Sequence, residues 1–116
     1  MREDLKAQQL FEEVLQKTET GRIRWEPTAK ENLFIAPIGG QFTLAVSENA
    51  REDGYGNEYT QVVLVLKDKE RELITVTTDI EGVEDFRMRQ LYELARRLAN
   101  KVDDQIDKVL GELSKL

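Results

Sequence analysis

The sequence predicts an α+β domain with an N-terminal helix, a five-stranded antiparallel meander sheet, and a long C-terminal helix packed with the first helix on one face of the sheet. Apolar residues recur at helical spacing near the start of the chain and again over the last third. Between them lie short segments rich in alternating or β-branched apolar residues, separated by glycine-containing or charged turns. The length of 116 residues suits one hydrophobic core, so we expect a single domain over residues 1–116.

The first helix is predicted over residues 3–18, where apolar residues share one face. A first strand is predicted over residues 22–26, because Ile23 and Trp25 fall on the same side of an extended chain. Pro27 is expected to end this strand, since proline has no amide hydrogen to donate to a sheet.

The other four strands are predicted over residues 33–38, 42–47, 59–67 and 73–78. Gly39 and Gly40 predict a tight hairpin turn between the first two of these strands, because a type I′ turn needs positive φ at both central positions. Residues 48–58 contain several turn-forming residues and predict a loop.

The final helix is predicted to run from Phe86 to the end of the chain. About 30 residues make a helix of roughly 45 Å, whereas a strand of about seven residues spans only roughly 23 Å. The helix should therefore extend beyond the sheet, yet its apolar stripe continues to the last turn. A second copy, a partner or the first helix must cover that part, and this favours self-association.

The face of the sheet opposite the helices is also expected to be partly apolar. Leu33 and Ile35 alternate with Phe34, and Val63 and Val65 lie in a continuous apolar strand. Both faces of these strands are therefore apolar, and an uncovered patch of this kind usually marks an interface.

The composition excludes several kinds of chemistry. Histidine and cysteine are absent, which removes Ser-His and Cys-His nucleophiles and ordinary zinc, haem and iron–sulfur ligation. We predict no catalytic residue, metal ligand or cofactor. Carboxylates leave an alternative open, because Asp103 and Asp107 share a helix face and Asp53 lies in a glycine-containing loop. A solvated helix face explains Asp103 and Asp107 more simply.

Five residues are candidates for binding a partner, namely Trp25, Tyr55, Arg89, Arg96 and Arg97. Tyr55 is flanked by glycines at a predicted loop tip, and exposed aromatics favour interfaces. The arginines form the main basic cluster of the sequence, and they suggest a further hypothesis, that the protein binds RNA along a basic strip. The net charge of −6 argues against nucleic acid, because residues 19–83 carry twelve acidic and seven basic side chains. Pairing of the arginines with carboxylates of the sheet is the simpler interpretation.

A cytoplasmic location is expected. No stretch approaches the ~20 apolar residues that span a bilayer, and the N-terminal segment lacks the pattern of a signal peptide. The absence of cysteine fits a reducing compartment.

Three segments together resemble a family of small, stand-alone, uncharacterised bacterial proteins. They are Lys17–Trp25, Phe34–Gly40 and Leu91–Asp103. The resemblance implies a bacterial cytoplasmic origin and the fold described above, and it implies no activity, ligand or catalytic residue.

These observations favour a protein-interaction module that forms a homodimer. It would act as an adaptor, a chaperone-like factor, or the neutralising partner of a toxin or nuclease. The alternative is a metal-binding protein or enzyme that depends on carboxylates.

Overall fold

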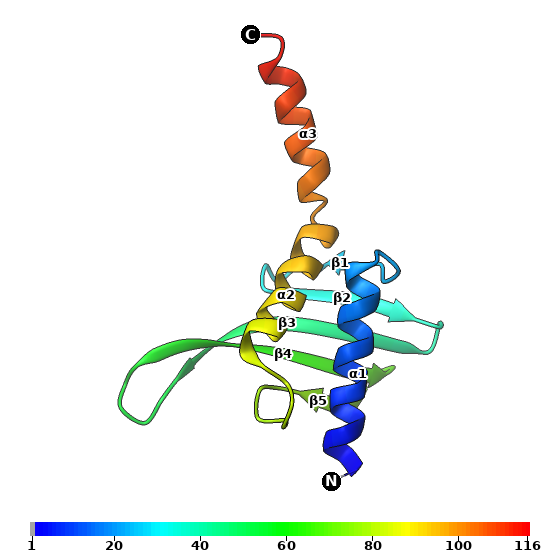
Figure 1. Cartoon of the computed structure of the whole chain (residues 1–116), viewed down its shortest axis with the longest axis vertical. Helices are drawn as coiled ribbons and strands as arrows, with labels where there is room; N and C mark the ends of the chain where they lie inside the picture. The colour runs from blue at the N-terminus through cyan, green and yellow to red at the C-terminus, as the bar shows by residue number, and fades with distance from the viewer. Residues whose placement is uncertain (1) are drawn as a thin grey trace.

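A computed structural model describes the backbone of residues 2–116 and the side chains of residues 5–116. The elements are α1 (Arg2–Glu19), β1 (Glu26–Pro27), β2 (Leu33–Ile38), β3 (Phe42–Glu52), β4 (Glu58–Asp68), β5 (Arg71–Val76), α2 (Asp85–Ala99) and α3 (Val102–Leu113). The strands form one antiparallel sheet in the order β1-β2-β3-β4-β5. Helices α1 and α2 lie side by side on one face of it (Figure 1). The predicted α+β meander is confirmed.

The core lies between the sheet and these two helices. Its centre is a row of side chains paired directly across four strands, Phe34, Val46, Leu64 and Val76. All four are at most 1% exposed, and Phe11, Leu15, Met88 and Leu91 of the helices close over them. Burying one such side chain contributes roughly 1.5–3 kcal/mol. This apolar layer therefore fixes the helices on the sheet.

Helices α1 and α2 are also joined by an ion pair. Both terminal nitrogens of the Arg87 guanidinium donate to the Glu12 carboxylate, with 2.7 Å between Nη2 and Oε2. The same guanidinium lies over the Phe11 ring, 5.5 Å from its centroid. The hydrogen bonds from Arg87 hold the pKa of Glu12 below its ordinary value of 4.5.

This pair predicts an acid-sensitive part of the stability. Because the pKa of Glu12 is lower in the folded state, its contribution is complete above the ordinary value and is lost as the pH falls through the folded one. The side chains of Arg87 and Glu12 are 27% and 42% exposed, so solvent screens the pair and we expect about 0.5–1 kcal/mol.

Urea titrations of the wild type and Glu12→Gln measure the free energy of unfolding at neutral pH and at about pH 3. The wild type should be more stable than the variant at neutral pH, and this difference should shrink towards zero in acid. Glu13→Gln changes the next carboxylate along α1 and is the control. A difference between wild type and Glu12→Gln that stays constant with pH would show that the ion pair is not its source.

The first strand differs from the prediction. Residues 22–25 are not a strand, and β1 consists of Glu26 and Pro27, which pair with Ile35 and Phe34. Pro27 is tolerated because β1 is the outermost strand, where an amide hydrogen is not required on the solvent side. The preceding segment instead places the Trp25 indole against α1, where Nε1 donates to the Thr18 hydroxyl at 3.0 Å.

The predicted loop over residues 48–58 is also wrong. β3 and β4 stay paired from Glu48 and Val62 out to Glu52 and Glu58, so the turn contains only residues 53–57. The two strands form an arm that projects from the sheet (Figure 1). Its side chains are mostly polar, so they lack the apolar alternation that predicts a strand, although backbone hydrogen bonds form without it.

The last strand and the last helix need correction as well. β5 spans Arg71–Val76 rather than residues 73–78, and a bulge beside Lys67 shifts its register. The expected single C-terminal helix is two helices. Lys101 adopts the left-handed conformation with φ 52°, which ends α2 and redirects the chain into α3. Apolar residues keep helical spacing across this break, so the pattern could not reveal it.

Candidate functional site

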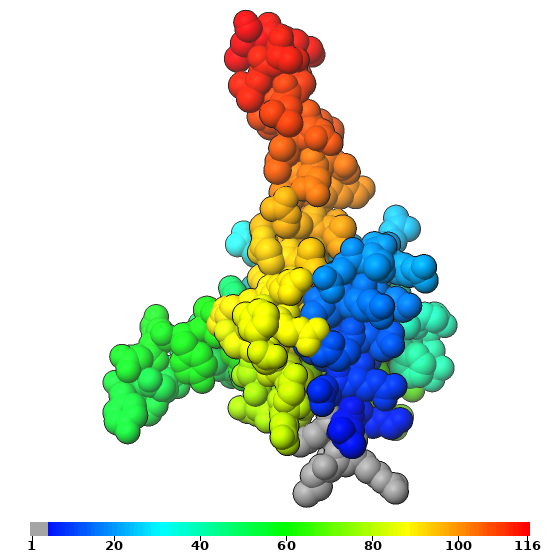
Figure 2. All heavy atoms as spheres, viewed as in Figure 1, coloured from blue at the N-terminus to red at the C-terminus, as the bar shows by residue number. Residues whose placement is uncertain are grey.

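Helix α3 projects from the domain with its apolar residues uncovered. None of its residues is buried, and it extends clear of the sheet and of the other helices (Figures 1 and 2). Its apolar side chains, here called the α3 stripe, are Val102, Ile106, Val109, Leu110 and Leu113. The last four are 45–56% exposed. They gather on one face of an amphipathic helix, which is how a helix that binds another surface is built.

Specific contacts fix the start of α3. The Arg97 guanidinium of α2 donates to the Asp103 carboxylate at 2.7 Å, across the break. The Gln105 side-chain amide donates to the Asn100 carbonyl at 2.9 Å, which satisfies one of the free carbonyls at the end of α2. These contacts bridge the two helices although no apolar residue of α3 is buried.

Charges are distributed unevenly along α3. Asp103 and Asp104 lie in its first turn, and Asp107 follows one turn later. The only basic residues, Lys108 and Lys115, lie in or just after its second half. Acidic side chains near the start of a helix stabilise it, because they interact with the positive end of the helix dipole. The helix therefore has an acidic first half and a second half that is close to neutral or basic.

A second uncovered apolar surface lies on the sheet. Strand alternation turns five residues away from α1 and α2, namely Leu33, Ile35, Ala45, Val63 and Val65. Four are half-buried and Ala45 is 9% exposed, and none belongs to the core cluster. Ile35, Ala45 and Val65 are paired directly across three strands, so the patch is continuous. This open face confirms that both sides of the sheet are partly apolar.

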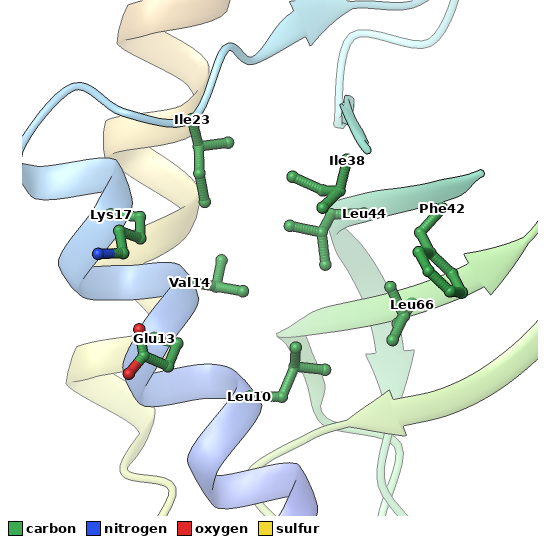
Figure 3. A pocket seen from close by; sticks show the side chains of 9 residues that line it. All are labelled: Leu10, Glu13, Val14, Lys17, Ile23, Ile38, Phe42, Leu44 and Leu66. Carbon is green, nitrogen blue, oxygen red and sulfur yellow. The ribbon is translucent and has the colours of Figure 1, made fainter. Parts of the chain in front are cut away.

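A third apolar surface is a cavity of about 310 Å³ between α1 and the sheet. Leu10, Val14 and Ile23 face Ile38, Leu44 and Leu66 across it (Figure 3). The charged ends of Glu13 and Lys17 turn away from it. No pattern in the sequence could indicate this cavity, because its walls come from four separate elements and the loop after α1.

The structure separates the predicted binding residues. Trp25 is 4% exposed and belongs to the core, so its surface is not free to bind a partner. Tyr55 is 92% exposed at the tip of the arm. The tip is held by Asp53, whose carboxylate accepts from the amides of Asn57 and Tyr55 at 3.0 and 2.8 Å. These hydrogen bonds lower the pKa of Asp53 below its ordinary value.

The three arginines do not form a shared basic strip. Arg89 donates to the Thr60 carbonyl at 2.7 Å and pairs with Asp85 and Glu48, so it fastens α2 to the base of the arm. Arg96 pairs with Glu93 of its own helix, which lowers the pKa of that carboxyl. Arg97 pairs with Asp103. No two of these arginines share a carboxylate, and one of the four partners, Glu48, belongs to the sheet.

The carboxylate clusters do not converge. Among the side chains of residues 5–116, no group of three or more acidic residues is positioned to share a metal ion. The Asp53 carboxylate closes the turn of the arm, and the Asp103 carboxylate is paired with Arg97.

Comparisons of the chain with protein-family models, with curated proteins and with solved structures found no match. Among the described residues, no helix combines the length and apolar character needed to cross a bilayer. The α3 stripe, the open face of the sheet and the cavity beside α1 are the features of the molecule that indicate binding.

Proposed function

We propose that the protein is a protein-interaction module whose partner binds along helix α3. The observation that carries the proposal is the α3 stripe, which places four large aliphatic side chains on one face of a helix without a buried residue. Contiguous exposed apolar surface of this kind marks a binding site on a protein. The open face of the sheet and the cavity beside α1 are further surfaces for such contacts.

The length of α3 supports the same proposal. It has 12 residues, and an isolated helix shorter than about 12–15 residues is marginally stable in water. Helices in proteins are stabilised mainly by packing of their apolar face. Binding would bury the α3 stripe and supply the packing that this chain does not provide for it.

The role that we propose is that of an adaptor, a chaperone-like factor or a neutralising partner, in the cytoplasm of a bacterium. The resemblance to small bacterial proteins supports the location. The paired arginines and the net charge of −6 favour a protein as the partner over nucleic acid.

Affinity capture from a lysate of the source organism tests the proposal with two matched double variants. Ile106→Gln/Val109→Gln replaces the centre of the α3 stripe, and Asp104→Gln/Lys108→Gln replaces two residues of the polar face. Neither variant changes the net charge, and glutamine is a good helix former. Proteins enriched by the wild type should fall at least about tenfold with the stripe variant, which corresponds to about 1.4 kcal/mol, and persist with the polar-face variant. Equal capture by all three forms would contradict binding along α3.

A further inference from the structure

The α3 stripe has the spacing of a helix that pairs with another helix. Val102, Ile106, Val109 and Leu113 are separated by four, three and four residues, and Leu116, three residues beyond the end of α3, continues this spacing. This is the a/d repeat by which two helices pack side chains into one another. Leu110 flanks the repeat and widens the apolar face.

The repeat is self-complementary when two copies run in opposite directions. In that arrangement Ile106 of one copy lies opposite Val109 of the other, and Val102 lies opposite Leu113. Each of these four layers, two of each kind, joins a smaller side chain to a larger one, so the layers have similar total volume. Similar layers allow even packing along the pair.

The charges also favour opposite directions. A parallel pair would place the acids of one first half, Asp103, Asp104 and Asp107, next to those of the other. An antiparallel pair sets each acidic half beside the second half of the other copy, where Lys108 and Lys115 outnumber Glu112, and it aligns the two helix dipoles head to tail. Keeping the two acidic halves apart lowers their repulsion, so the distribution of charge along α3 favours the antiparallel arrangement.

The position of α3 leaves room for a second copy. It extends away from the sheet and its end is the farthest point of the chain from the arm and α1 (Figure 1). Antiparallel pairing places the two domains at opposite ends of the helices. It also brings Leu116 of the second copy to the end of α2, where Leu98 is 43% exposed.

Building on the proposed function, we propose that the partner of α3 is α3 of a second copy, paired antiparallel with Ile106 opposite Val109. A helix of 12 residues is only about 18 Å long. Two such helices bury less than the ~1,200 Å² of a standard stable interface, so the dimer is weak and exchanging. Its dissociation constant should be on the order of 10 µM.

Sedimentation of the full chain from about 1 to about 300 µM tests the pairing. The wild type should change from monomer to dimer over this range. Ile106→Gln/Val109→Gln should raise the dissociation constant at least about 30-fold, and Asp104→Gln/Lys108→Gln should change it less than about threefold. Circular dichroism verifies that each variant stays folded, which we expect because α3 contributes no buried residue.

Disulfide trapping tests the direction, because the chain has no cysteine of its own. Val102→Cys and Leu113→Cys are mixed and oxidised. Antiparallel pairing predicts the mixed disulfide between the two variants, since these positions face each other. Disulfides that join two copies of the same variant would indicate parallel helices and overturn the proposal.

Two further outcomes would overturn it while leaving the proposed function intact. A wild type that stays monomeric over the whole range, but still captures proteins through the α3 stripe, would show that α3 binds a different protein. A dimer that persists in Ile106→Gln/Val109→Gln would place the contact on another surface, such as the open face of the sheet. A monomer that also captures nothing would overturn both proposals.

Discussion

Replacing Phe11 with alanine is expected to lower the free energy of unfolding by about 3–5 kcal/mol. Phe11 is fully buried in α1, where its ring packs in the core and lies beneath the Arg87 guanidinium of α2. The substitution leaves a cavity, because the surrounding sheet and helices relax only partly. It also removes the ring surface that positions Arg87 towards Glu12. The loss is a large part of the ~5–15 kcal/mol that stabilises a typical domain.

Urea unfolding followed by the fluorescence of the single tryptophan measures this effect. Leu5→Ala is the matched control, because Leu5 lies on the same helix but is 65% exposed. It should change the free energy of unfolding by less than about 0.5 kcal/mol. If the two substitutions had similar effects, α1 would not be docked on the sheet through Phe11.

The parts of the fold that the sequence predicts well are those where burial imposes a period on the residue types. The α1 helix and the strand β2 are examples, because Val14 and Phe34 must each face the core and their neighbours follow the pattern. The arm is the opposite case. Its strands are held by backbone hydrogen bonds between residues such as Arg51 and Tyr59, and beyond the Glu48–Val62 pair neither side of it is buried deeply enough to impose a pattern.

The break at Lys101 escaped prediction for a different reason. One left-handed residue changes the direction of a helix without disturbing the spacing of apolar residues on either side of it. The uncovered stripe could be predicted, since a helix of about 30 residues outruns the sheet. Because the chain breaks at Lys101, the stripe lies on a separate helix that projects from the domain. The cavity beside α1 depends on tertiary packing alone and has no sequence signal.

The role of Trp25 is ambiguous in the sequence, and its contacts in the structure show that it belongs to the core. It is 4% exposed, and its indole nitrogen donates to Thr18, whose hydroxyl is itself buried at 1% exposure. Trp25→Phe is expected to lower the free energy of unfolding by about 2–4 kcal/mol. The smaller ring leaves space in the core, and the Thr18 hydroxyl loses its donor, which alone costs about 1–3 kcal/mol.

A double-mutant cycle with Thr18→Val isolates the hydrogen bond. Thr18→Val leaves the buried indole N–H without an acceptor, so it should be destabilising by about 1–3 kcal/mol. Combining it with Trp25→Phe removes both partners, and the double variant should be more stable than the sum of the single effects predicts by about 1 kcal/mol. Urea titrations followed by circular dichroism are needed, because Trp25→Phe removes the only fluorescent indole.

The same variant separates a core role from a binding role. Substituting a core residue lowers the stability of the fold but leaves the affinity between folded molecules unchanged. Substituting a residue at the interface lowers the affinity but leaves the stability unchanged. We therefore expect folded Trp25→Phe to self-associate with a dissociation constant within about threefold of the wild type. Unchanged stability together with a large loss of affinity would mean that Trp25 lies at the interface, in conflict with its burial against Thr18.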